Sequence, residues 1–265
     1  MTGVYPERCM RKAYRFELCA ESLEAAQAAQ AGGADRLELC TELAIGGVTP
    51  NCALLADTLK AVSIPVHVLI RPRGGDFAYS EAEFNLMRRQ VEEAKALGAA
   101  GVAVGILLPN GEIDVPRTRE LTELARPMCV TFHRAFDEVT GYDDAADYDE
   151  ATGLEQVFGQ ALEDVIRTGA DCLLTSGGAA NVLEGAEQIG RLQAQAGDRL
   201  EIMAGGGLKL SNLSEVVRIS RVTSLHGSLS RARAVRSTKE AQSVLVNDLR
   251  EAIRLLQAEC LEPAG

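Results

Sequence analysis

The chain of 265 residues is 46% hydrophobic and 25% charged, which is typical of a globular protein with a full core. Its formal net charge of -11 argues against binding to nucleic acid or to an anionic membrane surface, because both need a Lys/Arg-rich surface. No apolar stretch is long enough to span a membrane, and residues 1–13, which read as a flexible lead, contain no hydrophobic signal core. We therefore expect a cytoplasmic protein whose partners are small molecules or soluble proteins.

Short apolar segments alternate with amphipathic segments of helical length along the chain. The sequence predicts strands near residues 15–19, 36–40, 65–70, 101–106, 128–133, 172–175, 200–204 and 223–226. It predicts helices near residues 22–31, 51–62, 80–97, 116–125, 154–168, 181–196, 211–219 and 238–258. Ser22, Asn51, Ser80 and Asn181 are expected N-caps, because their side chains can accept from N–H groups of a first helical turn.

Glycine ends several predicted helices shortly before the next strand, because it takes the left-handed cap conformation without steric cost. Eight strand–helix units in strict alternation predict a single (β/α)8 TIM barrel over residues 1–265. The alternative is an open doubly wound sheet, which usually has a glycine-rich turn after its first strand. The turn at residues 20–23 has no glycine and the chain has no P-loop lysine, so no nucleotide cofactor is indicated.

The seven cysteines give no sign of a disulfide framework. Their number is odd, they are widely spread, and no CxxC spacing typical of zinc sites is present. We expect reduced thiols, most of them buried as small apolar side chains.

The first two strands repeat a pattern of apolar residues, glutamate and cysteine. Side chains alternate between the two faces of a strand, so Glu17 shares a face with Cys19, and Glu38 shares a face with Cys40. The opposite faces are apolar and fit the helix-covered outside of a barrel. We expect both carboxylates and both thiols to face the interior, with the thiols nearer the mouth.

Polar residues gather at the C-terminal ends of the strands, where the active site of a TIM barrel forms. The third strand is expected to turn Arg71 into the mouth, and the glycine-bearing loop after it adds Arg73 and Asp76. Arginine binds carboxylates and phosphates through two parallel hydrogen bonds, so an anionic ligand is predicted. The alternative is that these arginines pair internally with Asp76 or with the interior glutamates.

The fifth and eighth strands are expected to add Thr131, His133 and His226 to the same mouth. His133 is a candidate general base that Asp137, one turn later, would orient.

Glycines follow the sixth and seventh strands, at Ser176-Gly177 and Gly205-Gly206. Backbone N–H groups in such loops, at the start of a helix, can bind an oxyanion, and TIM barrels often bind phosphate near the last strands. Glycine pairs also serve as ordinary tight turns. These four residues are therefore candidate ligand-binding positions.

Several segments resemble the CutC copper homeostasis family, in order and with matching spacing. The resemblance runs from about residue 15 to about residue 230 and rests on residues 33–40, 46–50, 70–77, 130–137, 174–177 and 203–207. It implies a cytoplasmic TIM barrel that forms homo-oligomers and handles copper. It further implies that Cu(I), which prefers sulfur, is bound by the two cysteines at the matching positions, Cys19 and Cys40.

Two functions of different kinds remain open. In the first, Cys19 and Cys40 bind Cu(I) for copper homeostasis. In the second, the barrel is an enzyme that holds a small phosphate- or carboxylate-bearing substrate at its mouth, while Glu17, Glu38 or His133 moves protons.

The connection at residues 138–153 is long and rich in acidic side chains. A solvated loop insertion is the plain interpretation, and a site for a hard cation is the alternative.

Overall fold

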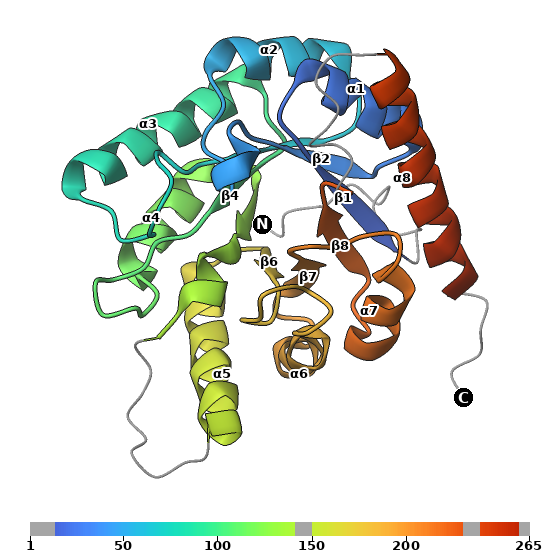
Figure 1. The fold of residues 1–265 in the computed structure, drawn as a ribbon. Helices are drawn as coiled ribbons and strands as arrows, with labels where there is room; N and C mark the ends of the chain where they lie inside the picture. The colour runs from blue at the N-terminus through green and yellow to red at the C-terminus, as the bar shows by residue number, and fades with distance from the viewer. Residues whose placement is uncertain (1–13, 141–149, 230–238, 260–265) are drawn as a thin grey trace.

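The chain folds as a closed barrel of parallel strands surrounded by helices (Figure 1). The computed structural model describes residues 14–140, 150–229 and 239–259. The strands in these ranges are β1 (Arg15–Ala20), β2 (Arg36–Leu39), β3 (Val66–Leu69), β4 (Gly101–Val104), β5 (Cys129–Phe132), β6 (Cys172–Thr175), β7 (Glu201–Gly205) and β8 (Ser224–Gly227). Each pairs with its neighbours in chain order, and β8 closes the barrel against β1. The predicted (β/α)8 TIM barrel is confirmed.

The helices lie on the outer face of the barrel (Figure 1). They are α1 (Leu23–Gly32), α2 (Cys52–Ala61), α3 (Glu81–Leu97), α4 (Val115–Ala125), α5 (Glu150–Thr168), α6 (Ala186–Ala196), α7 (Leu213–Ser220) and α8 (Lys239–Glu259). The short 3-10 helices η2 (Leu43–Ile45) and η3 (Arg134–Glu138) follow β2 and β5. Among the described helices, none combines the length and the apolar character that crossing a membrane requires. The expected lead at 1–13, and residues 141–149 of the acidic connection 138–153, lie outside the described residues.

Side-chain caps explain where several helices begin. The side chains of Ser22, Asn51 and Ser80 each accept a hydrogen bond from a backbone N–H group in the first turn of α1, α2 and α3. The expected cap at Asn181 is wrong, because α6 begins only at Ala186. The Asn181 side chain instead accepts from two N–H groups of the loop that comes after β6.

Alternation along β1 and β2 separates two environments, as predicted. The apolar side chains that pack under the helices are those of Phe16, Leu18, Leu37 and Leu39. The residues between them face the barrel interior, where the parallel register sets each beside a neighbour from the next strand. Glu17 lies opposite Arg36 of β2 and His226 of β8, and Cys19 lies opposite Glu38. The barrel thus brings polar side chains of three strands together.

Gly101 of β4 makes room for a histidine ring inside the barrel. It lies opposite His67 of β3 in the strand register. A Cβ atom at position 101 would lie 2.6 Å from the His67 ring. The imidazole therefore fills the space that a side chain on β4 would need.

We expect Gly101→Ala to lower the free energy of unfolding by roughly 1–3 kcal/mol, because the added methyl group overpacks a closed interior. Chemical denaturation measures this change. In a His67→Ala background the ring is gone, and the same substitution should cost much less. An equal cost in both backgrounds would contradict the steric explanation.

Candidate functional site

A cavity of about 980 Å³ lies at the C-terminal ends of the strands, in the mouth of the barrel. The residues expected at the site that line it are Cys19, Glu38, Arg71, Asp76, His133, Gly206 and His226. Loops around residues 43–46, 75–78 and 107–111 supply much of the remaining wall. This volume is within the usual range for sites that bind small organic molecules.

Glu17 lies within the barrel and is the centre of a buried ionic network. Its carboxylate forms an ion pair with Arg36, and its Oε1 is 2.7 Å from Nδ1 of His226. Nδ1 of His67 is 3.9 Å from Oε2 of the same carboxylate. Burial alone would raise the pKa of Glu17, but the Arg36 charge and the His226 hydrogen bond hold it well below its usual range. Glu17 is therefore ionised at physiological pH.

The charge on Glu17 fixes the position of the proton on the His226 ring. An ionised carboxylate can only accept hydrogen bonds, so Nδ1 of His226 carries the proton and Nε2 is the nitrogen that can meet a ligand. Burial lowers the pKa of His226. The hydrogen bond to Glu17 and the nearby charge of Glu38 raise the pKa by more than burial lowers it, so the net shift is upward.

Glu38 has an environment unlike that of Glu17. Burial, with the negative charge of Glu17, raises the pKa of Glu38 to about 7, although His226 and Arg36 act in the opposite direction. Its carboxyl group therefore exchanges a proton near neutral pH, which is the property a general acid or base requires.

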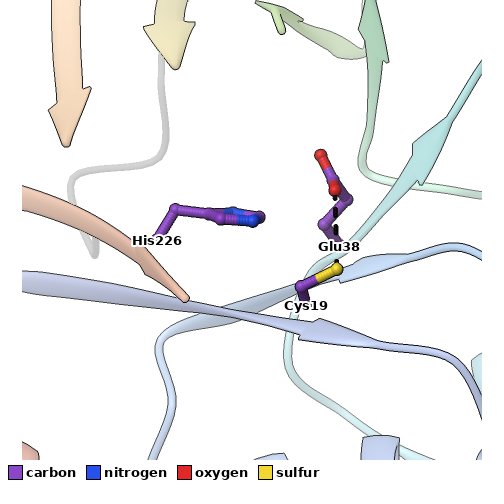
Figure 2. A group of neighbouring side chains, drawn as sticks. All are labelled: Cys19, Glu38 and His226. Carbon is purple, nitrogen blue, oxygen red and sulfur yellow. Dashed lines mark hydrogen bonds between the residues drawn. The ribbon is translucent and has the colours of Figure 1, made fainter. Parts of the chain in front are cut away.

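Cys19 in β1 and Cys40, directly after β2, form a close pair of buried thiols. Their sulfur atoms are 3.6 Å apart. The Cys19 sulfur is also 3.8 Å from Oε1 of Glu38, a contact that Figure 2 marks with a dashed line. The hydrogen bond with Cys40 and the burial of the thiol raise the pKa of Cys19 well above its ordinary value. Cys19 is thus a protonated thiol at neutral pH.

Cys19, Glu38 and His226 point toward one another (Figure 2). Their ligand atoms all lie within 4.8 Å of one another, so these three residues could hold a metal ion. Cys19 therefore belongs to two donor sets, one of two sulfurs and one of sulfur, oxygen and nitrogen.

Arg71 lies in the cavity wall, where its guanidinium is held by backbone carbonyl groups. It donates to the carbonyl oxygens of Ile45, Gly47 and Gly75 at 3.0, 2.9 and 2.7 Å. Its Cζ also lies 4.8 Å from the centre of the Phe77 ring. The guanidinium is fixed in position before any ligand arrives.

His133 and Asp137 do not form the base and carboxylate pair that the sequence suggested. Nδ1 of His133 accepts a hydrogen bond from the backbone N–H of Ala135 at 3.1 Å, and its Nε2 is buried without a partner. Burial and the charge of Arg71 lower the pKa of His133 to about 3, so the ring is neutral. A neutral imidazole that accepts at Nδ1 carries its proton on Nε2 and is a donor there.

Asp137 instead occupies the glycine loop after β6. Its carboxylate accepts from the N–H groups of Ser176 at 3.0 Å and Gly178 at 3.2 Å, and it pairs with Arg134 at 2.7 Å. The N–H of Gly177 donates to the hydroxyl of Thr175, the last residue of β6. The loop is an anion-binding turn of the expected kind, but its anion belongs to the protein. The expected binding of an external oxyanion by Ser176 and Gly177 is therefore blocked.

Arg73 lies outside the cavity lining and ties its loop to α3. It forms ion pairs with Asp76 at 2.9 Å and Glu83 at 2.6 Å, and it stacks over the ring of Tyr79. The internal pairing with Asp76, which the sequence left open, is the arrangement found. Arg71 and Arg73 are thus separated by role, although only one residue stands between them.

Two more expected residues lie in the barrel wall and do not line the cavity. Thr131 is buried beside Cys172 of β6, and Gly205 ends β7. Gly206 does reach the cavity, with φ of +102°, and a Cβ there would come within 3.0 Å of the Arg134 side chain. Of this glycine pair, only the second forms part of the site.

Arg36 and Phe77 are site residues that the sequence analysis missed. The alternation along β2 that turns Glu38 and Cys40 inward also turns Arg36 inward, so the sequence pattern could have identified Arg36. Phe77 lies in an irregular loop, where no periodic pattern indicates the direction of a side chain.

The chain is therefore a TIM-barrel protein with a buried carboxylate–histidine–thiol cluster at its C-terminal cavity. A sequence model of the CutC family matches residues 14–231, and the chain belongs to this family. The resemblance carried by the motifs is confirmed.

Known relatives agree with this assignment. A protein described as family protein CutC from Chromobacterium violaceum is 45% identical over 213 residues, covering 80% of each chain. The copper homeostasis protein cutC homolog of Homo sapiens is 40% identical over 220 residues, covering 83% of this chain and 75% of the human one. A solved structure of CutC from Streptococcus agalactiae superposes with a TM-score of 0.72 at 27% identity, covering 81% of this chain and 98% of that one.

The raised pKa of Glu38 predicts how stability depends on pH. The pKa is about 7 in the folded protein against an ordinary value of 4.5. Between these values the folded state keeps a proton that the unfolded state has released, so the free energy of unfolding falls as the pH rises. At about 1.4 kcal/mol per pKa unit, the loss is up to about 3 kcal/mol.

Glu38→Gln removes the ionisation and should raise the free energy of unfolding at about pH 8, with little change at about pH 5. Urea denaturation of the metal-free protein at both values measures this. A variant that is no more stable than the wild type at the higher pH would contradict the assignment.

Proposed function

We propose that this protein binds Cu(I) in the cytoplasm through Cys19 and Cys40, as part of copper homeostasis. The observation that carries this proposal is the 3.6 Å separation of two buried thiol sulfurs, of which Cys19 lines the cavity and Cys40 lies behind the lining. Cu(I) is a soft cation that prefers thiolate ligands. The name of the human relative, a copper homeostasis protein, supports the same role.

The two thiols could share one ion without a change in the strands. Two metal–sulfur bonds of about 2.3 Å place the sulfurs about 4.6 Å apart when the S–metal–S angle is straight. The observed sulfur–sulfur distance of 3.6 Å is shorter and corresponds to a bent S–metal–S angle. The sulfurs come from neighbouring strands of a closed sheet, whose spacing is fixed by backbone hydrogen bonds. The pair is therefore held ready for a metal ion.

Binding requires that the thiols lose their protons. The raised pKa of Cys19 means that Cu(I) must displace a proton, and its affinity should fall as the pH falls. Glu38, whose Oε1 is 3.8 Å from the Cys19 sulfur, can accept that proton when it is ionised. We thus assign Glu38 the role of proton acceptor in metal binding.

Cys19→Ser and Cys40→Ser should each weaken Cu(I) binding by more than about 100-fold, because each removes one of two ligands. Anaerobic titration of the full chain against a competing Cu(I) chelator measures this. Cys172→Ser is the matched control, because Cys172 is also buried in the barrel interior but lies in a separate apolar cluster with Leu174 and Met203. Wild-type affinity in either site variant would refute the proposal.

His226→Ala distinguishes the two donor sets that share Cys19. If the two sulfurs bind Cu(I), this variant keeps Cu(I) affinity within about threefold, while Cys40→Ser loses it. If His226→Ala loses Cu(I) affinity and Cys40→Ser keeps it, the ion is bound by Cys19, Glu38 and His226, a donor set that suits Zn²⁺.

A second candidate function is favoured by the size and polarity of the cavity. A volume of about 980 Å³ is far more than one ion needs. Glu38, with a pKa of about 7, and His226 lie together at its wall as a pair able to exchange protons. This arrangement supports an enzyme that acts on a small anionic molecule by general acid–base catalysis.

For the enzyme, a metabolite library screened by thermal shift should contain a ligand that raises the Tm of the wild type, because a ligand of the folded state stabilises it. Glu38→Gln should still bind that ligand but lose turnover, since the amide cannot take up a proton. Full turnover in Glu38→Gln would exclude Glu38 as the catalytic acid or base.

A further inference from the structure

Among the residues that the structure describes, no acidic side chain pairs with the buried charge of Arg71. Arg71 is 6% exposed, and in the described part of the chain its guanidinium makes no ion pair. Two other arginines are paired: Arg36, at the start of β2, with Glu17, and Arg134, at the mouth, with Asp137. A buried cation surrounded by neutral carbonyl groups attracts an anion from the adjoining cavity.

Part of the Arg71 guanidinium is not used by the protein. Three of its N–H bonds donate to loop carbonyls, while its Nε has no hydrogen-bond partner. A guanidinium has five N–H donors, so two remain, and the nearby Tyr79 hydroxyl can take up one of them.

His133 presents a second buried donor at the same cavity. Its Nδ1 is occupied by the N–H of Ala135, so the proton lies on Nε2, and Nε2 is buried without an acceptor. The ring is 4% exposed and lines the cavity. An unpaired buried donor costs free energy, and an oxygen atom of a ligand would remove that cost.

The Phe77 ring lies close to both donors, Arg71 and His133. Its ring centre is 4.8 Å from Cζ of Arg71 and 5.1 Å from the ring centre of His133. A cation, a neutral N–H donor and an aromatic ring thus lie together on the side of the cavity formed by the ends of β3 and β5.

We infer that Arg71 and His133 form a subsite for the carboxylate group of a small organic ligand, with Phe77 as its apolar support. The charge of Arg71 balances the carboxylate, and Nε2–H of His133 donates to one of its oxygens. His133 is then a hydrogen-bond donor that positions the ligand, and not the general base that its residue type suggested.

The surroundings favour a carboxylate over a phosphate. Glu138 also lines the cavity, and its negative charge would repel a dianion more strongly than a monoanion. The loop N–H groups after β6 that could share the charge of a phosphate already donate to Asp137. A single negative charge is what one guanidinium can balance.

The subsite deepens the second candidate function and rests on it for any reaction of the bound ligand. The same cavity wall carries Glu38 and His226 from β2 and β8. A ligand anchored by its carboxylate would direct its other end to these two side chains. Binding itself depends on neither Cu(I) nor turnover, so it can be tested alone.

The first test needs no substitution. Protein labelled with ¹⁵N at histidine should show His133 as the neutral Nε2–H tautomer from about pH 5 to about pH 8. Titration with pyruvate as a carboxylate probe should shift its Nε2–H resonance to saturation, while sodium chloride at equal ionic strength should not. A proton found on Nδ1, or a resonance that pyruvate leaves unmoved, would overturn the inference.

The second test uses a matched pair of arginines. Arg71→Gln and His133→Phe should each weaken pyruvate binding by at least about tenfold, because each removes one donor. Arg73→Gln is the control, since this neighbouring arginine is paired with Asp76 and Glu83 outside the lining. Equal affinity in all three variants would refute the subsite, and thermal unfolding checks that each is folded.

Three further measurements distinguish the subsite from the metal site and from the enzymatic function. Inorganic phosphate that binds more tightly than pyruvate would overturn the assignment to a carboxylate. Pyruvate binding that survives Cys19→Ser confirms that the subsite is independent of the metal proposal. Binding without turnover of any library compound would leave the subsite in place and contradict only the enzymatic function.

Discussion

The buried carboxylate of Glu17 is the interaction on which the site depends. A charge inside a barrel must be balanced, and the strand register supplies Arg36 on one side and His226 on the other. The balance keeps Glu17 ionised, and the ionised carboxylate sets the proton position on His226. Its charge also raises the pKa of both Glu38 and Cys19. One fixed charge thus acts on each of these groups, together with burial and, for Cys19, the hydrogen bond with Cys40.

The cavity has two chemically opposite sides. Cys19, Glu38 and His226, from β1, β2 and β8, are groups that could exchange protons or hold a metal ion, whereas Arg71 and His133 follow the ends of β3 and β5 and have only hydrogen-bond donors left unpaired. Backbone carbonyls hold the guanidinium and a backbone N–H holds the imidazole, so both are oriented without a ligand. Such a division suits a molecule that is anchored at one end and altered, or held near a metal, at the other.

Regular structure was predictable from the sequence, and loop geometry was not. Period-two alternation correctly turned Glu17, Cys19, Glu38 and Cys40 inward, and it contained the signal for Arg36 as well. The pairing of His133 with Asp137 failed because η3 carries Asp137 toward the loop after β6, and no sequence period encodes that path. Protonation states could not be predicted from the sequence either. Glu17 and Glu38 occur in the same repeated motif, but their pKa values shift in opposite directions because of neighbours that only the folded barrel brings near.

The loop after β6 has a consequence for the ligands it can admit. Asp137 fills a nest made by the N–H groups of Ser176 and Gly178 and by the guanidinium of Arg134. A change of Asp137 to a residue without a carboxylate would leave these donors facing one vacant space, which is the donor set that binds phosphate. The aspartate therefore takes the place that a phosphate takes in loops of this kind, and its negative charge keeps a phosphorylated ligand out of this loop.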